Sequence, residues 1–429
     1  MTGTSARASS RAAQSSAQPS ASSLFRSSRI LSVDVLRGFA MVFMALDHAR
    51  DYFSGMPFPP EDLSHTWPAL FFARWITHFC APIFFFLAGT GAFLWASRGK
   101  LRGELSRFLY TRGLWLVMLE YTVVGFGWAF RYPFGFAQTI WALGWSMIFL
   151  GLLVWLPVRW TAAIGVTIVA LHDVTDRLAP AQFGNLAWLW TILHVPGLVW
   201  VVPGKFALII GYPLVPWVGV MAAGFGFGAI MKMEPARRQR MILAIGALGT
   251  LSFLVLRGAN LYGNPPNTGA GAFIAAPDSN GPWHAQDTFP MTVVSFLNVQ
   301  KYPPSLQFLL MTLGPSLLLL AWLDRRDAAG SFGVVQKFFL VYGRVPMMFY
   351  VVHIYLIHAM AALVAWICGQ PASWLMHGAM FFNPLPAGYG HGLAFIYLMW
   401  ALAVVLLYLP CRRFAELKAR RKDWWLSYL

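Results

Sequence analysis

The sequence predicts an all-α polytopic membrane protein with about ten transmembrane helices and both termini in the cytoplasm. Of its 429 residues, 58% are hydrophobic and only 11% are charged, and this balance excludes a soluble globular enzyme. Apolar runs of about 20 residues recur along the chain, and each is long enough to cross a hydrocarbon core of roughly 30 Å as a helix. The distribution of basic residues supplies a third indication, because it sets the direction in which the chain crosses the bilayer.

The chain is strongly basic, with 32 Lys and Arg against 16 Asp and Glu and a formal net charge of +16. In a soluble domain this excess would suggest nucleic acid, but here most basic residues fall in short segments between apolar runs. If the N-terminus is cytoplasmic, 23 of them lie on inner segments and 5 on outer segments. This bias predicts a multi-pass protein of the inner (cytoplasmic) membrane, with the lipid bilayer as a partner and no nucleic acid.

Composition divides the chain into three regions. Residues 1–28 are rich in Ser, Ala and Gln and lack acidic residues, which is typical of a disordered tail. Residues 29–410 form the predicted multi-pass membrane domain, and residues 411–429 form a basic cytoplasmic tail. The apolar stretch 187–202 is broken by proline, so we expect a re-entrant or interfacial segment there. The ten predicted spans are 31–50, 69–96, 114–130, 139–157, 160–172, 205–231, 241–257, 305–323, 338–367 and 391–410.

The two longest outer segments, 173–204 and 258–304, carry Pro, Gly, Trp and His. Loops of this length in a compact domain are usually functional or disordered, and we expect a cap over an outward-facing cavity. The second loop ends in the run KYPPS, which begins with Lys301 and Tyr302, and both are expected to line that cavity. The run GFGFG at 224–228 lies within an apolar span and predicts close helix packing.

Neither a disulfide framework nor a metal site is predicted. Three cysteines are too few for a framework. The outer run that contains His172, Asp173 and Asp176 has no second histidine at helical spacing and no cysteine pair, so it favours a solvated loop over a metal. The cysteines are expected to be free thiols: Cys80, Cys368 and Cys411.

The first span carries ionisable residues where they are costly. A charge near the bilayer centre costs roughly 2.5 to 3.5 kcal/mol on insertion scales, so such residues generally face a partner or a wet cavity. Asp34 and Arg37 are three residues apart and are expected to pair. Arg37 and His48 are eleven apart, so they share one helix edge at about 16 Å separation. This edge suits a long substrate with an anionic head and a reactive far end.

His48 has two carboxylates nearby in the sequence. Asp51 lies one turn onward and is expected to fix the tautomer of the imidazole, whereas Asp47 is rotated about 100° away and is expected to line the cavity. A histidine at the end of a helix is also favoured by the helix dipole without any chemical role, and this second interpretation stays open.

Later spans add further candidates. Arg74 and His78 are four residues apart and are expected to line the same cavity, unless Arg74 extends outward to the interface. Arg344 precedes a helix that begins at Pro346, and a helix N-terminus beside an arginine is a favourable phosphate site. Three more residues complete the set: Glu120, as a partner for Arg37 or Arg344, and Tyr350 and His353, which share a helix face and are expected to line the cavity.

Four stretches of the sequence resemble the transmembrane acyltransferases, and most closely the bacterial proteins that carry the catalytic domain of heparan-alpha-glucosaminide N-acetyltransferase. They are SVDVLRGFAMVFMALDH at 32–48, FFARWITHFCAPIFFFLAGTGAFL at 71–94, KYPPSLQFLLMTLGP at 301–315 and YGRVPMMFYVVHIYLIH at 342–358. Related bacterial surface-sugar O-acyltransferases have Arg, ten residues and then His on the first helix, which is the spacing of Arg37 and His48. The animal acetyltransferase instead has its reactive histidine in the following loop, where His65 is the nearest residue here. The resemblance therefore implies two catalytic candidates, His48 and His65.

The resemblance implies an integral-membrane acyltransferase. It would move an acyl group, expected to be acetyl, from cytoplasmic acyl-CoA to a hydroxyl or amine of an extracytoplasmic saccharide or glycolipid. Asp34, Arg37 and Arg344 would bind the acyl-CoA, which is a co-substrate and not a permanently bound cofactor. His48 would act as a general base or as a nucleophile, and a homodimer is a possible assembly. The alternatives are a transporter or flippase without covalent chemistry, or a family member that only binds.

Overall fold

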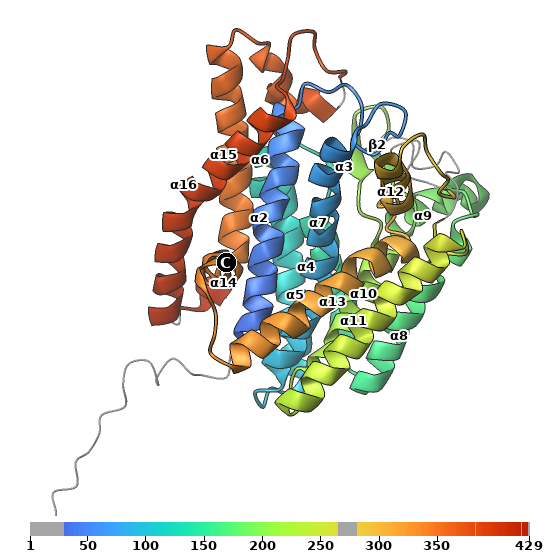
Figure 1. Ribbon diagram of the computed structural model, residues 1–429, viewed down its shortest axis with the longest axis vertical. Coiled ribbons are helices and arrows are strands. Elements are labelled where there is room, and N and C mark those ends of the chain that lie inside the picture. The colour runs from blue at the N-terminus through green and yellow to red at the C-terminus, as the bar shows by residue number, and fades with distance from the viewer. Residues whose placement is uncertain (1–29, 265–280, 382, 422, 428–429) are drawn as a thin grey trace, which may run out of the picture.

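The protein is a bundle of long helices, seen in a computed structural model that describes residues 30–264, 281–381, 383–421 and 423–427 (Figure 1). The tail predicted at 1–28 lies outside these residues. The α-helices are α2 (Leu31–Phe53), α3 (Pro68–Trp75), α4 (Cys80–Ala96), α5 (Arg102–Leu119), α6 (Gly125–Ala129), α7 (Thr139–Leu153), α8 (Val158–Leu171), α9 (Ala187–Leu193), α10 (Leu214–Ile230), α11 (Pro235–Gly258), α12 (Phe289–Leu297), α13 (Leu306–Ala328), α14 (Val334–Arg344), α15 (Pro346–Ile367) and α16 (Leu393–Arg420).

Short segments connect these helices. Five are 3₁₀-helical and one, η2, is a π-helical turn that joins α5 to α6. The strands are β1 (Phe136–Ala137), β2 (Gly197–Val202) and β3 (Phe206–Ile210). The short helices are η1 (Ile76–Phe79), η2 (Glu120–Val124), η3 (His172–Thr175), η4 (Pro180–Leu186), η5 (Ala372–Phe381) and η6 (Trp424–Ser427).

Several helices begin where the sequence supplies a cap or a proline. The side chains of Thr288, Ser305 and Glu234 accept hydrogen bonds from backbone N–H groups in the first turns of α12, α13 and α11. Proline occupies the first turn of α3, α11 and α15, where its missing N–H would have no helical partner in any case. Local sequence therefore sets these starting points before any tertiary packing.

In the part of the chain that the structure describes, five helical segments are long and apolar enough to cross a membrane: Pro68–Ala96, Pro235–Gly258, Leu306–Ala328, Pro346–Ile367 and Leu393–Arg420. Two shorter apolar helices, α7 and α10, accompany them. The protein is thus a helical membrane protein, as predicted. Helix α2 is also 23 residues long, but it carries several charged side chains. The count of ten spans and the cytoplasmic position of both termini stay predictions.

A small sheet was not predicted. Strand β3 pairs antiparallel with β2 and parallel with β1. The predicted span 205–231 is therefore wrong at its start, because β3 occupies its first residues and α10 begins only at Leu214. The stretch 187–202 forms α9 and β2, and its Val-rich end favours a strand.

Other predicted boundaries also differ from the structure. The span 114–130 begins inside α5, which starts at Arg102, and the span 69–96 is divided into α3, η1 and α4. The span 338–367 is two helices, α14 and α15, because Val345 precedes a proline and is kept out of helical geometry (φ −132°, ψ 50°). Helix α16 continues through Pro410 to Arg420, so the basic tail predicted from residue 411 begins inside a helix. The three cysteines are free, as predicted.

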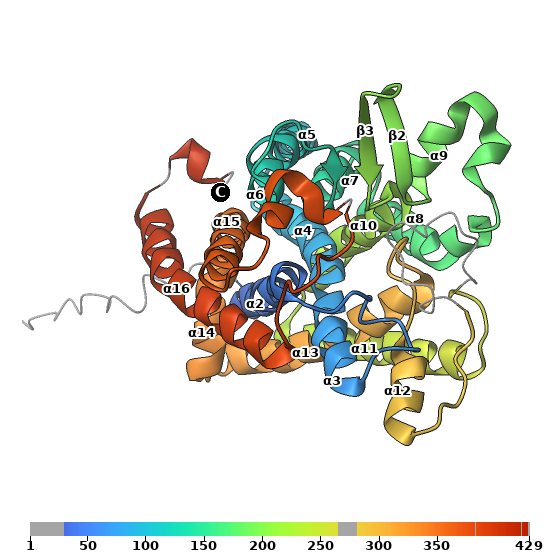
Figure 2. The same cartoon turned by 90° about the horizontal axis from the view of Figure 1, so that it is seen from above.

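Helix α2 lies near the middle of the bundle and packs against α4, α13, α14, α15 and α16 (Figure 2). It begins at the lower face of Figure 1 and ends at the upper face, and these two names are used below. The contact with α14 brings backbones together, since a Cβ atom on Gly38 would overlap the Phe339 carbonyl and one on Gly343 would overlap the Asp34 carbonyl. In the same way Gly224 of α10 meets the Phe86 carbonyl of α4, which confirms the close packing predicted for the GFGFG run.

Candidate functional site

His48 lies in the upper half of α2 and contacts a second histidine from α15. Its Nδ1 is 2.7 Å from Nε2 of His353, and the two rings stack at 4.9 Å between centroids. Trp128 of α6 meets the His48 ring edge to face at 4.8 Å. His353 is fully buried, and its Nδ1 lies 2.9 Å from the Phe349 carbonyl of its own helix. The structure therefore joins two of the predicted site residues in a direct imidazole pair.

The expected contact between Asp51 and His48 is wrong. Asp51 accepts a hydrogen bond from Arg50 at 2.6 Å, while Nδ1 of His48 is occupied by His353. Helical spacing places Asp51 one turn beyond His48, but the neighbouring Arg50 competes with His48 for the Asp51 carboxylate. Asp51 instead lines a cavity at the upper face.

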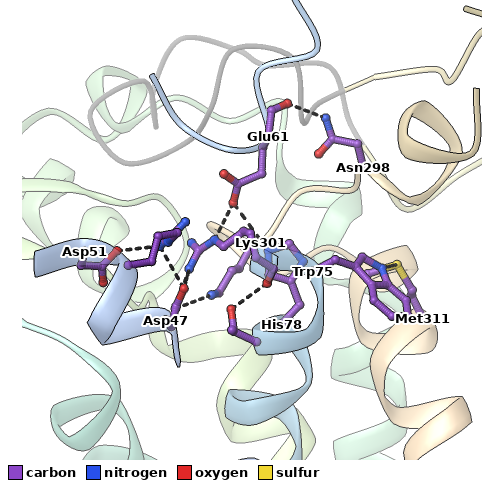
Figure 3. Close-up of polar contacts among 11 residues, drawn as sticks. Asp47, Asp51, Glu61, Trp75, His78, Asn298, Lys301 and Met311 are labelled. Carbon is purple, nitrogen blue, oxygen red and sulfur yellow. Dashed lines mark hydrogen bonds and ion pairs between the residues drawn. The ribbon is translucent and has the colours of Figure 1, made fainter. Parts of the chain in front are cut away.

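A network of ion pairs surrounds the upper end of α2 (Figure 3). Asp47 accepts hydrogen bonds from Arg50 at 2.9 Å and from Arg74 of α3, and Nζ of Lys301 lies 3.8 Å away. Arg74 also donates to Glu61 at 2.7 Å. Each of these side chains is at most 14% exposed, so the charges are compensated inside the protein rather than by water.

Glu61 comes from the loop that joins α2 to α3, and sequence reasoning did not single it out. Burial alone would raise the pKa of its carboxyl, but the Arg74 guanidinium and the neighbouring His78 hold that pKa well below its usual range. Nε2 of His78 lies 3.6 Å from the carboxylate. The Asn298 side chain donates to the Glu61 carbonyl at 2.8 Å, which ties this loop to the segment before α13 (Figure 3).

The upper cavity has a volume of about 370 Å³ and a mixed polar and aromatic lining. Three of the predicted lining residues are found there: Arg74, Lys301 and Tyr302. Asp47 and His78 are not among its lining residues: Asp47 pairs with Arg74, and His78 lies beside Glu61. The charged and aromatic side chains of its lining are Arg50, Asp51, Phe58, Glu61, Arg74, Lys301, Tyr302 and Trp374.

The lower cavity, of about 390 Å³, is lined by four cationic residues and a mainly apolar wall. Arg37 donates to Asp34 at 3.0 Å, which confirms the predicted pair, and also to the Gly343 carbonyl at 3.3 Å. Tyr350 lines this cavity, whereas His353 one turn later contacts His48. The four cations are Arg37, Arg112, Arg344 and Lys418. Arg112 and Lys418 were missed because their positions indicated only the orientation of the chain.

Along α2 the lower cavity ends near Met41 and the upper cavity begins near Arg50, so His48 falls between them. It lines neither cavity. On α15 the order is the same, with Tyr350 at the lower cavity and His353 at the imidazole pair. Arg37 and His48 therefore share one edge of α2 but not one cavity. Arg37 lines the lower cavity, and His48 lies above it, in contact with His353.

The second catalytic candidate, His65, lies in the loop before α3 and its side chain is 61% exposed. It contacts Asp62 at 2.7 Å and Ser64 at 2.8 Å, and its ring stacks on Phe58. His65 lines neither of the two cavities, although Phe58 lines the upper one. All of its polar contacts are within its own loop.

Two weaker suggestions also have outcomes. Glu120 accepts the backbone N–H of Trp141 at 2.8 Å, so the suggested pairing with Arg37 or Arg344 is wrong. His172 contacts Asp173 and the Pro304 carbonyl. Within residues 30–264, 281–381, 383–421 and 423–427, no group of three or more His, Cys, Asp or Glu side chains could hold a metal ion.

Comparison with known proteins assigns the chain to a family. The family model for the catalytic region of heparan-alpha-glucosaminide N-acetyltransferase matches residues 29–261, which is more than half of the chain. The matched region contains α2, the loop with Glu61, and Arg112 of the lower cavity, and it ends before Lys301 and His353. No curated protein matches the chain.

Proposed function

The chain belongs to the heparan-alpha-glucosaminide N-acetyltransferase catalytic family, and we propose that it moves an acyl group, expected to be acetyl, from acyl-CoA to a saccharide. The family indicates a transmembrane acetyltransferase. The proposal adds a donor at the lower face, a hydroxyl or amine acceptor at the upper face, and His48 between them. The observation that carries it is the placement of His48 between a cation-lined cavity and a polar, aromatic-lined cavity.

The lower cavity suits an acyl-CoA. Arg37, Arg112, Arg344 and Lys418 supply cationic groups for phosphates, and arginine binds phosphate in a bidentate manner. The rest of the lining is mainly apolar, which fits a pantetheine arm and an acyl chain. A volume of about 390 Å³ lies in the usual range of ligand sites. Acyl-CoA would enter and leave as a co-substrate.

The upper cavity suits a saccharide. Its carboxylate, guanidinium and ammonium groups can hydrogen-bond several hydroxyls at once, and Phe58 and Trp374 offer aromatic faces for a sugar ring. With this cavity on the outer side, the acceptor would be an extracytoplasmic saccharide or glycolipid. The protein would then reside in the inner membrane, as a monomer or a homodimer.

The reaction balances without any further reagent. His48 takes the proton of the acceptor hydroxyl as the acceptor oxygen attacks the thioester carbonyl, and the C–S bond breaks. The proton then passes to the departing thiolate, which leaves as a thiol. A positioned general base of this kind typically contributes about 10²- to 10⁴-fold in rate. In the alternative route the imidazole itself takes the acyl group and passes it on.

The direct test incubates purified protein with labelled acetyl-CoA and a mixture of saccharides. We expect labelled saccharide from the wild type and a loss of at least about 100-fold in His48→Gln. His65→Gln is the matched control, because it replaces the other candidate histidine by the same residue. Full activity in His48→Gln together with loss in His65→Gln would move the chemistry to the loop. Movement of unmodified saccharide into vesicles, without label transfer, would support a transporter instead.

A further inference from the structure

We propose that His353 is a positioning residue that fixes the tautomer of His48, so that Nδ1 of His48 carries the proton and Nε2 carries the lone pair. This inference rests on the proposed function, in which His48 is the base. Helix α15 would then have two roles: Tyr350 lines the lower cavity, and His353 orients the catalytic imidazole.

The tautomers follow from the acceptors. The Phe349 carbonyl can only accept a hydrogen bond, so Nδ1 of His353 must carry a proton. His353 is 0% exposed, and burying a charged imidazole among aromatic rings is costly, so the ring is neutral and its Nε2 bears a lone pair. Nδ1 of His48, 2.7 Å from that lone pair, must then be the donor. A neutral His48 has one ring proton, which leaves Nε2 as a base.

Packing holds both rings in this arrangement. The Phe349 ring stacks on His353 at 5.1 Å and 9°, and Tyr350 meets the same ring edge to face at 5.7 Å. His48 is enclosed between His353 and Trp128. Among the residues that the structure describes, none hydrogen-bonds to Nε2 of His48. The base nitrogen is thus available while the other nitrogen is fixed.

The pair would work through the same bond during acyl transfer. When Nε2 of His48 takes the acceptor proton, the ring becomes an imidazolium, and its Nδ1–H bond to His353 becomes charge-assisted and stronger. The proton later leaves Nε2 for the thiolate sulfur, and His48 returns to its first tautomer. In Ser-His-Asp enzymes a carboxylate orients the histidine. Here a neutral imidazole does so, which avoids burying another charge.

Charged groups near His48 come from several elements. Asp47 and Arg50 lie on α2, Arg74 lies on α3, and Lys301 precedes α13, while His353 is the titratable neighbour on α15. Three of these groups are cations and one, Asp47, is a carboxylate, so their charges act on His48 in opposite directions. The contribution of His353 must therefore be measured in a background where these groups are unchanged.

The test compares three variants of the full-length protein. His353→Leu removes the acceptor, and His353→Gln places an amide oxygen near the former Nε2, where it can accept from His48 but cannot hold the ring proton. His358→Leu removes a second buried histidine from α15, one whose nitrogens contact the Gly127 and Leu375 carbonyls. Solid-state NMR with ring-¹⁵N histidine reads the tautomers directly, and His48 is assigned by the signal lost in His48→Asn.

In the wild type we expect His48 with a protonated Nδ1 and a bare Nε2. In His353→Leu we expect both tautomers, a fall in kcat of about 100-fold, and an acid limb of the kcat/KM profile moved to lower pH, because the imidazolium loses its acceptor. His353→Gln should recover most of the rate, and His358→Leu should lower thermal stability without moving the acid limb.

The two proposals fail in different ways. A wild-type His48 with a protonated Nε2, or an unchanged rate and pH profile in His353→Leu, would overturn the positioning role. If His353→Leu does not fold, the wild-type tautomer and the His353→Gln kinetics still decide the matter. The expected tautomers with no acyl transfer to any acceptor would overturn the proposed function and leave the imidazole pair standing.

Discussion

The two cavities differ in which charged groups line them and in how those groups are arranged. At the upper face the cations Arg50, Arg74 and Lys301 already meet carboxylates of the protein, in a network that joins α2, α3, their connecting loop and the segment before α13. At the lower face four cations line one cavity together with a mainly apolar wall, and Arg37 among them pairs with Asp34 of its own helix. The charged groups at the upper face are thus joined to one another in one network, whereas those at the lower face share a cavity whose wall is otherwise mainly apolar.

The largest expected effect is on the upper network. Asp47→Asn removes the carboxylate that faces three cations, and breaking a largely buried ion pair typically costs about 3 to 5 kcal/mol. We expect a clear fall in the midpoint of thermal unfolding in detergent. Asp51→Asn is the control, because that carboxylate pairs only with Arg50 among the described residues and is 33% exposed, so about 1 kcal/mol or less is expected. Equal losses in both variants would show that the contacts of Asp47 with Arg74 and Lys301 add nothing to stability.

The next effect concerns the lower cavity. Arg344→Gln should raise the KM for acetyl-CoA by about 10- to 100-fold, the range for loss of one charged hydrogen bond. The KM for acetylpantetheine, which lacks the nucleotide phosphates, should stay within about twofold. A similar rise for both donors would mean that Arg344 shapes the cavity without contacting phosphate. Initial rates at several salt concentrations sharpen the result, since the wild-type preference for the nucleotide should weaken as salt screens it.

A smaller effect is expected from pH acting on Glu61. Its folded pKa lies below the unfolded value, so its ionised form stabilises the protein fully above about pH 5, and this contribution is lost as the pH falls through the folded pKa. The difference in unfolding midpoint between wild type and Glu61→Gln should therefore be largest near neutral pH and shrink in acid. A difference that grew as the pH fell would reverse the sign and contradict the ion pair with Arg74.

The smallest effect is expected at His65. Its side chain is mostly exposed and its partners lie in the same loop, so His65→Ala should change stability by less than about 0.5 kcal/mol. Acyl transfer should stay within about twofold of the wild type. A 100-fold loss of acyl transfer in folded His65→Ala would show that the loop approaches the acceptor during turnover. The acceptor site would then include His65.

The sequence predicted contacts that follow from helix periodicity. The pair of Asp34 and Arg37 is an example, because residues three apart on one helix must be neighbours. The partner of His48 is 305 positions away on α15, and spacing within one helix cannot reveal it. Helix periodicity alone therefore predicted Asp51 as the partner of His48, whereas Asp51 pairs with Arg50.

Other omissions have equally physical causes. Glu61 stands in a Pro-rich loop with no periodic pattern, so nothing local indicates that Arg74 folds back onto it. Strands β2 and β3 are short apolar runs, which periodicity cannot distinguish from the edges of buried helices. Arg112 and Lys418 lie in segments where basic residues are expected for topology alone, so their shared cavity becomes visible only in three dimensions.

The backbone contact between α2 and α14 bears on how such a protein can diversify. Arg37 directly precedes Gly38, and Arg344 directly follows Gly343, so two of the cavity's guanidinium groups stand beside glycines that admit no larger residue. Met41 and Leu143 line the same wall through their side chains, so a substitution there changes the shape of the cavity without bringing a Cβ atom against a backbone carbonyl of α2 or α14. Under the proposed function, the guanidinium groups that would meet the nucleotide phosphates are therefore held in place by a contact between main chains, whereas the wall that would enclose the acyl chain is shaped by side chains.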